Sequence, residues 1–175
     1  MEKQTLTKFK WFFAWNDERE EAWLGEMARQ GWHLRSPGLP GWYHFDHGEP
    51  RSDTYRMDYI LDRKDYANYL QLFRDAGWDH AGELGGWQYF RTAAQNGSFP
   101  EIYTDKASKA QKYRRVLTTL IVLMPIFVIS VTRPLNPDSR FYDLYGISKL
   151  FMSGILMLFT YSMMRLMMRI KNIKK

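Results

Sequence analysis

Apolar residues follow different patterns in the two parts of this chain of 175 residues. Up to about residue 95 they alternate with polar residues or recur every three to four positions, which is typical of strands and amphipathic helices. After residue 115 they form two long uncharged runs, Val116 to Thr132 and Ile147 to Met164, the second interrupted only by Lys149 near its start. The pattern therefore predicts a compact α+β domain followed by two long apolar helices.

The first 95 residues contain an internal repeat with a shift of 46 positions, which becomes 45 after a turn. The matching positions are Gly31 with Gly77, Gly41 with Gly86, and the row Phe9, Trp11, Phe13 with the row Tyr55, Met57, Tyr59. A unit that repeats its apolar positions is expected to repeat its fold. We therefore predict one duplicated domain over residues 1–105, with repeat 1 at about 6–48 and repeat 2 at about 52–94.

Each repeat is predicted to fold as strand, helix, strand, strand, in a mainly antiparallel sheet. The expected elements are 8–15, 17–30, 32–35 and 42–47 in repeat 1, and 54–61, 64–76, 78–83 and 87–92 in repeat 2. The first helix has an acidic first turn, as its dipole favours, and a buried stripe of Trp23, Leu24, Met27 and Ala28. The acidic pair Glu20 and Glu21 is interpreted as a solvated face of the helix start.

The charges fall into two opposite blocks. Residues 1–105 hold 12 Lys and Arg against 17 Asp and Glu, whereas residues 106–175 hold 13 against 2. The basic pI therefore does not indicate nucleic-acid binding, because the domain that would bind is acidic. In the second block the cations stand at the ends of the apolar runs, which is typical of a membrane hairpin.

This arrangement predicts two transmembrane helices, 116–132 and 147–168, joined by an external loop at 133–146. A basic helix or linker at 106–115 precedes them, and a basic tail at 169–175 follows. Because more cations flank the pair than lie in the loop, we expect both termini in the cytoplasm and the protein in the inner membrane. The residues expected to fix this topology and meet lipid headgroups are Lys109, Lys112, Arg114, Arg115, Arg165, Arg169 and Lys171. The alternative is a buried helical hairpin of a soluble protein.

Motifs for catalysis or metal binding are missing from the sequence. The chain has no cysteine, and it has no Gly-x-Ser-x-Gly or P-loop pattern. His44 and His47 would face opposite sides of a strand, so they diverge as metal ligands. We therefore predict no catalytic residue, no metal and no cofactor.

The repeat suggests one binding site for an anionic ligand. Lys10 and Arg56 occupy equivalent positions in the alignment, opposite the aromatic row, and Asp58 lies two residues along on the same face as Arg56. If the two leading strands pair, the cations meet in the middle of the sheet. The alternative is mutual neutralisation of Lys10 and Asp58 across the strands. The tryptophans are interpreted mainly as packing residues.

Several short motifs occur in a specific order along the first 105 residues. They are Glu21-Ala-Trp-Leu24, Gly31-Trp-His-Leu34, Tyr43-His-Phe45, Tyr55-Arg-Met-Asp-Tyr59, Ala76-Gly-Trp78, Trp87-Gln-Tyr-Phe90 and Glu101-Ile-Tyr-Thr-Asp105. The chain in this respect resembles the bacterial domain of unknown function family 2812 (DUF2812). The resemblance implies a cytoplasmic domain on a membrane anchor and a functional association with a PadR-like repressor. The element order is also similar to that of gyrase-inhibitor-like domains, whose duplicated modules form a groove for small molecules.

The sequence thus favours a membrane-anchored, non-enzymatic protein whose cytoplasmic domain binds a small ligand or a protein partner in a regulatory or stress-response role. Two alternatives stay open. One is a structural subunit that assembles with a membrane protein or with itself through the hairpin, where Ser153 and Gly154 would allow close helix packing. The other is an enzyme that acts on a lipid or a small metabolite.

Overall fold

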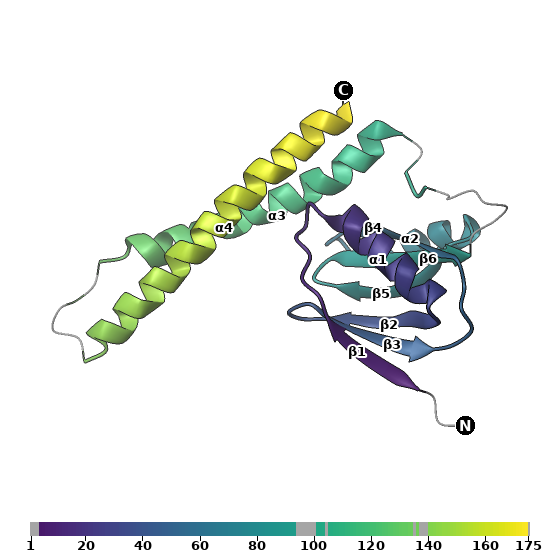
Figure 1. Ribbon diagram of the computed structural model, residues 1–175. Helices are drawn as coiled ribbons and strands as arrows, with labels where there is room; N and C mark the ends of the chain where they lie inside the picture. Colours follow the sequence, from purple (N-terminus) through teal and green to yellow (C-terminus); the bar gives the residue numbers. More distant parts are fainter. Residues whose placement is uncertain (1–3, 94–100, 104, 135, 137–139, 175) are drawn as a thin grey trace. The chain divides into compact units, whose positions relative to one another are not determined.

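The computed structural model describes residues 4–93, 101–103, 105–134, 136 and 140–174. The chain divides into two compact units, Met1–Ser108 and Lys109–Lys175. In chain order the elements are β1 (Thr5–Phe9), α1 (Asp17–Arg29), β2 (Trp32–Gly38), β3 (Trp42–His47), β4 (Asp53–Tyr59), α2 (Tyr66–Asp75), β5 (Asp79–Leu84), β6 (Trp87–Ala93), α3 (Lys106–Thr132) and α4 (Tyr142–Lys174) (Figure 1).

The first unit contains two three-stranded antiparallel sheets of the same topology. Their strand orders are β1-β3-β2 and β4-β6-β5, and each sheet has its helix inserted after its first strand. Each also has a register shift on its edge strand, between Leu34 and Ser36 in β2 and between His80 and Gly82 in β5. The predicted α+β class, with strand-helix-strand-strand twice and antiparallel pairing, is confirmed.

The register of β1 corrects the alignment of the two leading strands. Phe9 pairs with Trp42, and Tyr59 pairs with Trp87. Because Trp42 and Trp87 are the matched tryptophans of the two sheets, Phe9 corresponds to Tyr59, a shift of 50 positions. The sequence alignment, which matched Phe9 with Tyr55, is therefore wrong by four residues at this strand.

The strand predicted at 8–15 is also wrong in extent, because β1 ends at Phe9. The amide of Asn16 donates to the carbonyl of Phe13 at 2.7 Å and closes a turn before α1. The rings of Phe13 and Trp15 stack on each other, with centroids 4.7 Å apart. The alternation of aromatic residues here reflects ring stacking in a connecting segment and not the pleat of a strand.

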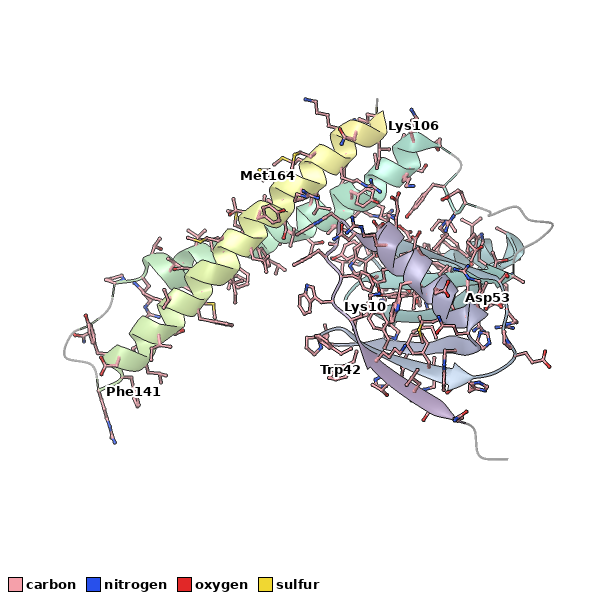
Figure 2. All side chains as sticks on the ribbon, in the orientation of Figure 1. Lys10, Trp42, Asp53, Lys106, Phe141 and Met164 are labelled. Carbon is pink, nitrogen blue, oxygen red and sulfur yellow. The ribbon has the colours of Figure 1, made fainter. Side chains whose placement is uncertain are left out.

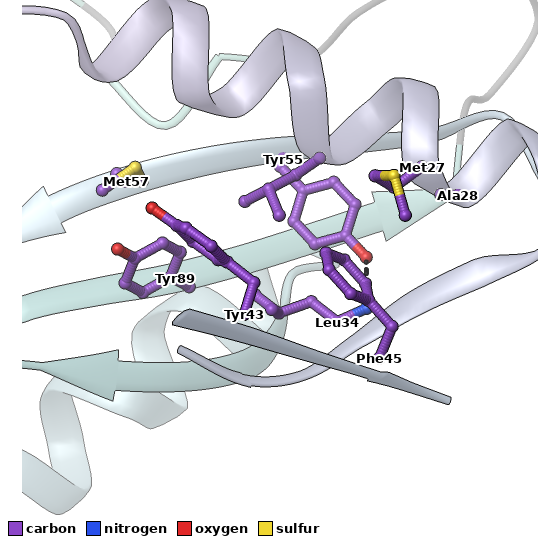
Figure 3. Close-up of a cluster of buried hydrophobic side chains, with 9 residues drawn as sticks. Met27, Ala28, Leu34, Tyr43, Phe45, Tyr55, Met57 and Tyr89 are labelled. Atoms are coloured by element: carbon purple, nitrogen blue, oxygen red, sulfur yellow. Dashed lines mark hydrogen bonds between the residues drawn. The ribbon is translucent and has the colours of Figure 1, made fainter. Parts of the chain in front are cut away.

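Helix α1 contacts β2 of its own sheet and β4 of the other sheet (Figure 1). Its predicted stripe is buried at Leu24, Met27 and Ala28, while Trp23 is half-buried. These side chains meet the inward faces of both sheets, so one core serves the whole unit (Figure 3). The strand residues of this core are Leu34, Tyr43, Phe45, Tyr55, Met57 and Tyr89.

The acidic start of α1 is not solvated, contrary to the sequence interpretation. Glu20 and Glu21 are only 6% and 7% exposed. Glu21 Oε1 accepts the backbone N–H of Met57 at 2.8 Å, so this carboxylate satisfies a donor on β4. A buried amide without a partner is costly, and Glu21 therefore helps to fix α1 against the second sheet.

Helix α2 covers the opposite face of the second sheet. Phe73 stacks on Phe90 of β6 with ring centroids 3.9 Å apart, and Tyr69 contacts both rings. The predicted stripe of Tyr66, Tyr69, Leu70 and Phe73 faces inward but is only half-buried. The second sheet thus has α1 on one side and α2 on the other, with its aromatic residues divided between the two faces.

The second unit consists of α3 and α4. Ring contacts join Phe127 to Phe159 at 4.7 Å, and the Arg169 guanidinium lies 5.8 Å from the Tyr113 ring, so the helices lie side by side and antiparallel. Helix α3 runs without a break from Lys106 through Pro125, and α4 starts inside the predicted loop. Both are long and apolar enough to cross a membrane, with mean hydropathy 2.1 and 1.5, and their apolar side chains are largely exposed. Length and composition thus allow both helices to span a membrane, and they give no topology.

The two sheets approach each other where β2 meets β5. At this contact Gly82 has φ +144°, and a Cβ there would lie 2.8 Å from Cδ of Pro37. Gly85, in the next turn, has φ +57° and open space around it. Substitutions at these two glycines therefore distinguish two contributions to the free energy of unfolding, the steric clash at a close contact and the strain of the backbone conformation.

We predict that Gly82→Ala destabilises the protein by about 2–3 kcal/mol, because a strained backbone and a clash with Pro37 combine. Gly85→Ala, the control, should cost only about 1 kcal/mol for its left-handed backbone. Urea denaturation of the full chain in detergent, followed by tryptophan fluorescence, measures both. Equal losses would show that the contact between β2 and β5 is not close.

Candidate functional site

A cavity of about 170 Å³ opens in the first unit, at the end where the β2–β3 and β5–β6 hairpins turn. The segment between β1 and α1, the start of α1 and both hairpins form its walls. Its lining residues are Trp11, Phe12, Phe13, Ala14, Asp17, Glu20, Leu39, Pro40, Gly41, Tyr43, Met57, Leu84, Trp87 and Tyr89. Most of this surface is aromatic or aliphatic, as in pockets that hold small molecules.

The carboxylate of Glu20 is the centre of the polar part of this cavity. Its Oε1 accepts hydrogen bonds from the Tyr43 hydroxyl and from the Tyr89 hydroxyl, both at 2.7 Å. Tyr43 comes from β3 of the first sheet and Tyr89 from β6 of the second, and Figure 3 shows their hydroxyl groups at the same side of the core. One oxygen atom therefore links α1 to both sheets.

Burial raises the pKa of Glu20 above its usual value. The two tyrosine hydrogen bonds lower this pKa in part, and the charge of Asp17, one turn earlier on α1, raises it further. Burial and the Glu20 charge also raise the pKa values of Tyr43 and Tyr89, so both hydroxyls stay neutral donors. The site thus holds a carboxyl group that takes up a proton more readily than an exposed one.

The mouth of the cavity is apolar and open to solvent. Trp11 is 52% exposed and Leu39 is 78% exposed. Nearby, Phe9 and Trp42 form an exposed edge-to-face pair with ring centroids 5.1 Å apart. Figure 2 labels Trp42 at the surface of the first sheet. Trp11 and Trp42 therefore pack against neighbouring rings, Phe13 and Phe9, but lie outside the buried core.

The predicted anion site is built differently from the prediction. Strand β1 pairs with β3 and β4 pairs with β6, so the two leading strands do not pair. Lys10 lies beyond the end of β1, and its ammonium sits over the Trp23 ring at 4.8 Å and the Phe12 ring at 5.3 Å. The premise that brought Lys10 and Arg56 together is therefore wrong, because it used the alignment with a shift of 46.

Arg56 and Asp58 do share a face of β4, and each has partners within the first unit. Arg56 donates to Glu101 Oε1 at 2.8 Å and lies 3.6 Å from Glu21 Oε2. Asp58 accepts the Tyr103 hydroxyl at 2.7 Å and the Tyr69 hydroxyl at 3.1 Å. These contacts hold segment 101–103 and α2 on the sheet, and an anion-binding role for Lys10, Arg56 and Asp58 stays a prediction.

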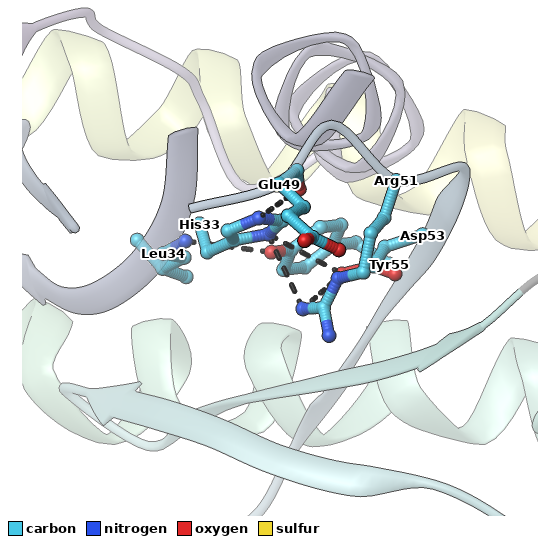
Figure 4. A network of polar contacts seen from close by, with 6 residues as sticks. All are labelled: His33, Leu34, Glu49, Arg51, Asp53 and Tyr55. Carbon is cyan, nitrogen blue, oxygen red and sulfur yellow. Dashed lines mark hydrogen bonds and ion pairs between the residues drawn. The ribbon is translucent and has the colours of Figure 1, made fainter. Parts of the chain in front are cut away.

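A second, more polar cavity of about 430 Å³ lies beside the connection from β3 to β4. His33 Nε2 contacts the Glu49 carbonyl at 2.8 Å, and Arg51 donates to Asp53 at 3.0 Å (Figure 4). Arginines and carboxylates in its walls offset each other's charge. Among the described residues, no group of three or more His, Cys, Asp and Glu could hold a metal. We interpret this network as a set of contacts that stabilise the connection between the two sheets.

The cations predicted to meet lipid headgroups all lie on α3 or α4. Lys112 and Arg169 place their charges over the Tyr113 ring, at 5.1 and 5.8 Å, and Arg165 lies 6.0 Å from the Tyr161 ring. The others are Lys109, Arg114, Arg115 and Lys171. Their role at a membrane surface stays a prediction.

The comparison with protein families gives one match. The model described as "Protein of unknown function (DUF2812)" matches residues 16–124, which is more than half of the chain. The chain belongs to this family. The match confirms the resemblance found in the sequence, and it covers α1, both tyrosines of the Glu20 site and the first part of α3. No curated protein and no solved structure matches the chain.

Sequence reasoning missed the site of this DUF2812 domain because Glu20 was assigned to the solvated face. A signal was present, since Glu20, Leu24 and Met27 follow the i, i+4, i+7 spacing of a buried helix face. Tyr43 likewise lies two residues before Phe45 of the core, in the same strand. The spacing of residues could not predict that α1, β3 and β6, which are distant in the chain, come into contact in the fold.

We predict that Glu20→Gln removes a pH dependence of stability from this protein. Because its folded-state pKa is raised, Glu20 contributes most to stability below about pH 4.5, and this contribution falls as the pH rises through the folded-state pKa. The glutamine can still accept both tyrosine hydrogen bonds but carries no charge. Urea denaturation from pH 4.5 to 8 should show that the variant gains stability relative to wild type as the pH rises.

The control is Glu26→Gln, on the exposed side of the same helix, where hydrogen bonds to Arg29 lower the pKa of Glu26. Because this pKa is lowered, the variant should lose a little stability relative to wild type just above pH 4.5, and the difference should stay constant above about pH 6. A constant difference for Glu20→Gln as well would contradict the raised pKa.

Proposed function

We propose that this DUF2812 protein is a membrane-anchored ligand-binding protein, with a regulatory and non-enzymatic role. Its first unit would bind a small molecule in the cavity at Glu20, and the presence of this ligand in the cavity would regulate the protein. The observation that carries this proposal is the buried carboxylate of Glu20 at a mostly apolar and aromatic cavity that is open to solvent.

The cavity differs from a packing defect in two respects. The opening of about 170 Å³ is continuous with solvent, so a ligand can enter it, unlike an enclosed void of the interior. Exposed aromatic residues at its mouth, Trp11 among them, leave apolar surface in water that a ligand could cover. A void of roughly 150 Å³ accommodates one benzene ring, so the cavity suits a group of about phenyl size.

A location at a membrane would suit a sensor role. Helices α3 and α4 could anchor the protein in the bilayer, and the cations that flank them favour both termini on the cytoplasmic side. The ligand-binding unit would then sample the cytoplasm next to the inner membrane. Compounds that concentrate at the bilayer surface would reach it at high local concentration.

We predict that some small aromatic compounds raise the melting temperature of the full chain in nonionic detergent, and that Ala14→Phe abolishes this effect. Ala14 lines the cavity, so a phenyl group there occupies the ligand's space. At 100 times its Kd, a ligand stabilises the folded state by about 2.7 kcal/mol. A thermal-shift screen with cationic, neutral and anionic aromatic compounds measures this.

The control is Ala67→Phe, which makes the same change at an exposed position on α2. It should keep the wild-type response. If no compound shifts wild type, or if Ala14→Phe responds as wild type does, the cavity is not a ligand site.

The topology gives a separate prediction, which the lack of native cysteine makes simple to test. Asn136→Cys, in the connection between α3 and α4, should react with a membrane-impermeant maleimide in intact cells. Ser52→Cys, at an exposed position between β3 and β4, should react only after the cells are permeabilised. The reverse pattern would place the ligand-binding unit outside the cytoplasm, and labelling of neither would argue against two spanning helices.

A further inference from the structure

We infer that the ligand of the Glu20 cavity is a lipophilic cation, a compound that carries a positive charge next to an apolar group of about phenyl size. This inference rests on the proposed ligand-binding function and specifies its chemistry. Three features of the cavity lead to it: the bonding of the carboxylate, the charges of the lining and the nature of its rings.

The first feature is the way in which Glu20 is bonded. Both tyrosine hydrogen bonds end on Oε1, and among the described residues no hydrogen bond ends on Oε2. Tyr43 and Tyr89 are neutral donors, so they orient the carboxylate without compensating its charge. A buried anion without an opposite charge is strongly unfavourable, and a bound cation would remove that cost.

The second feature is the sign of the lining. Glu20 and Asp17 are its acidic residues, and none of the residues that line the cavity is Lys, Arg or His. An anionic ligand would be repelled by the Glu20 carboxylate. A neutral ligand would leave the Glu20 charge as it is. A neutral donor could bond to Oε2 without compensating the Glu20 charge, whereas a cation compensates it, so the arrangement favours a cation most.

The third feature is the aromatic wall. Trp11, Phe12, Phe13 and Trp87 line the cavity, and the faces of such rings attract positive charge. The structure contains an instance of this attraction next to the site, because the Lys10 ammonium lies 5.3 Å from the centroid of Phe12. Lys10 itself does not line the cavity.

Binding should also be linked to protonation. The titratable groups that act on Glu20 are Asp17 on its own helix, Tyr43 on β3 and Tyr89 on β6. The segment 11–14, β4 and the β5–β6 hairpin contribute uncharged lining residues. A cation binds the ionised carboxylate, so it releases a proton wherever Glu20 is protonated in the free protein. The affinity for a cation should therefore rise with pH from about 4.5 and level off above the raised pKa of Glu20.

A pair of isosteric probes tests this inference on the full chain in nonionic detergent. Phenyltrimethylammonium and tert-butylbenzene have the same shape and differ in charge, and benzenesulfonate is the anionic comparison. Tryptophan fluorescence reports binding because Trp11 and Trp87 line the cavity. Phenyltrimethylammonium should bind wild type at least about tenfold more tightly than tert-butylbenzene, after correction for detergent partitioning, and benzenesulfonate should not bind.

Glu20→Gln should lose this preference and its pH dependence, whereas Glu26→Gln should keep both. Equal binding of the cation and its neutral isostere to wild type would overturn the inference and leave the ligand-binding function standing. Tighter binding of benzenesulfonate would overturn it in the same way. If none of the three probes binds and no compound in the thermal-shift screen acts through the cavity, the proposed function itself fails.

Discussion

A single carboxylate oxygen, Oε1 of Glu20, accepts hydrogen bonds from tyrosines of two separate sheets, and the site depends on this arrangement. Tyr43 and Tyr89 lie 46 positions apart in the chain and belong to different sheets. For both hydroxyls to reach one atom, α1 must lie between the inward faces of the sheets. The same placement puts the start of the helix, with Asp17 and Glu20, in the wall of the cavity at the hairpin ends.

Helix α1 belongs by sequence to the first repeat but satisfies groups of the second. Glu21 accepts the Met57 N–H of β4, and Glu20 accepts the Tyr89 hydroxyl of β6. Leu24, Met27 and Ala28 bury their side chains in the shared core at roughly 1.5–3 kcal/mol for the larger ones. The halves are therefore not independent folding units, and a ligand at the junction would report on the assembly of the whole domain.

Local periodicity was sufficient to predict most of the fold. The stripe on α1 and the strand at residues 42–47 follow from spacing alone, and the long helices follow from uncharged length. The segment 10–16 was wrongly predicted as part of a strand, because its stacked rings alternate along the sequence as strand residues do. The same error led to the incorrect alignment of Lys10 with Arg56. Glu20 was assigned to solvent because an acidic first turn is usually a dipole effect. Its burial depends on Tyr43 and Tyr89, which reach it only through the tertiary fold.

The most direct test of the account is the titration of the Glu20 carboxyl carbon by NMR, in full-length protein labelled with ¹³Cδ-glutamate. Comparison with Glu20→Gln assigns the signal. The account predicts that the free protein titrates above 4.5, the usual value, and that phenyltrimethylammonium lowers this pKa while tert-butylbenzene does not. A Glu20 pKa at or below 4.5, or one that the cation does not change, would contradict the central claim that Glu20 is a buried carboxylate whose charge a positively charged ligand compensates.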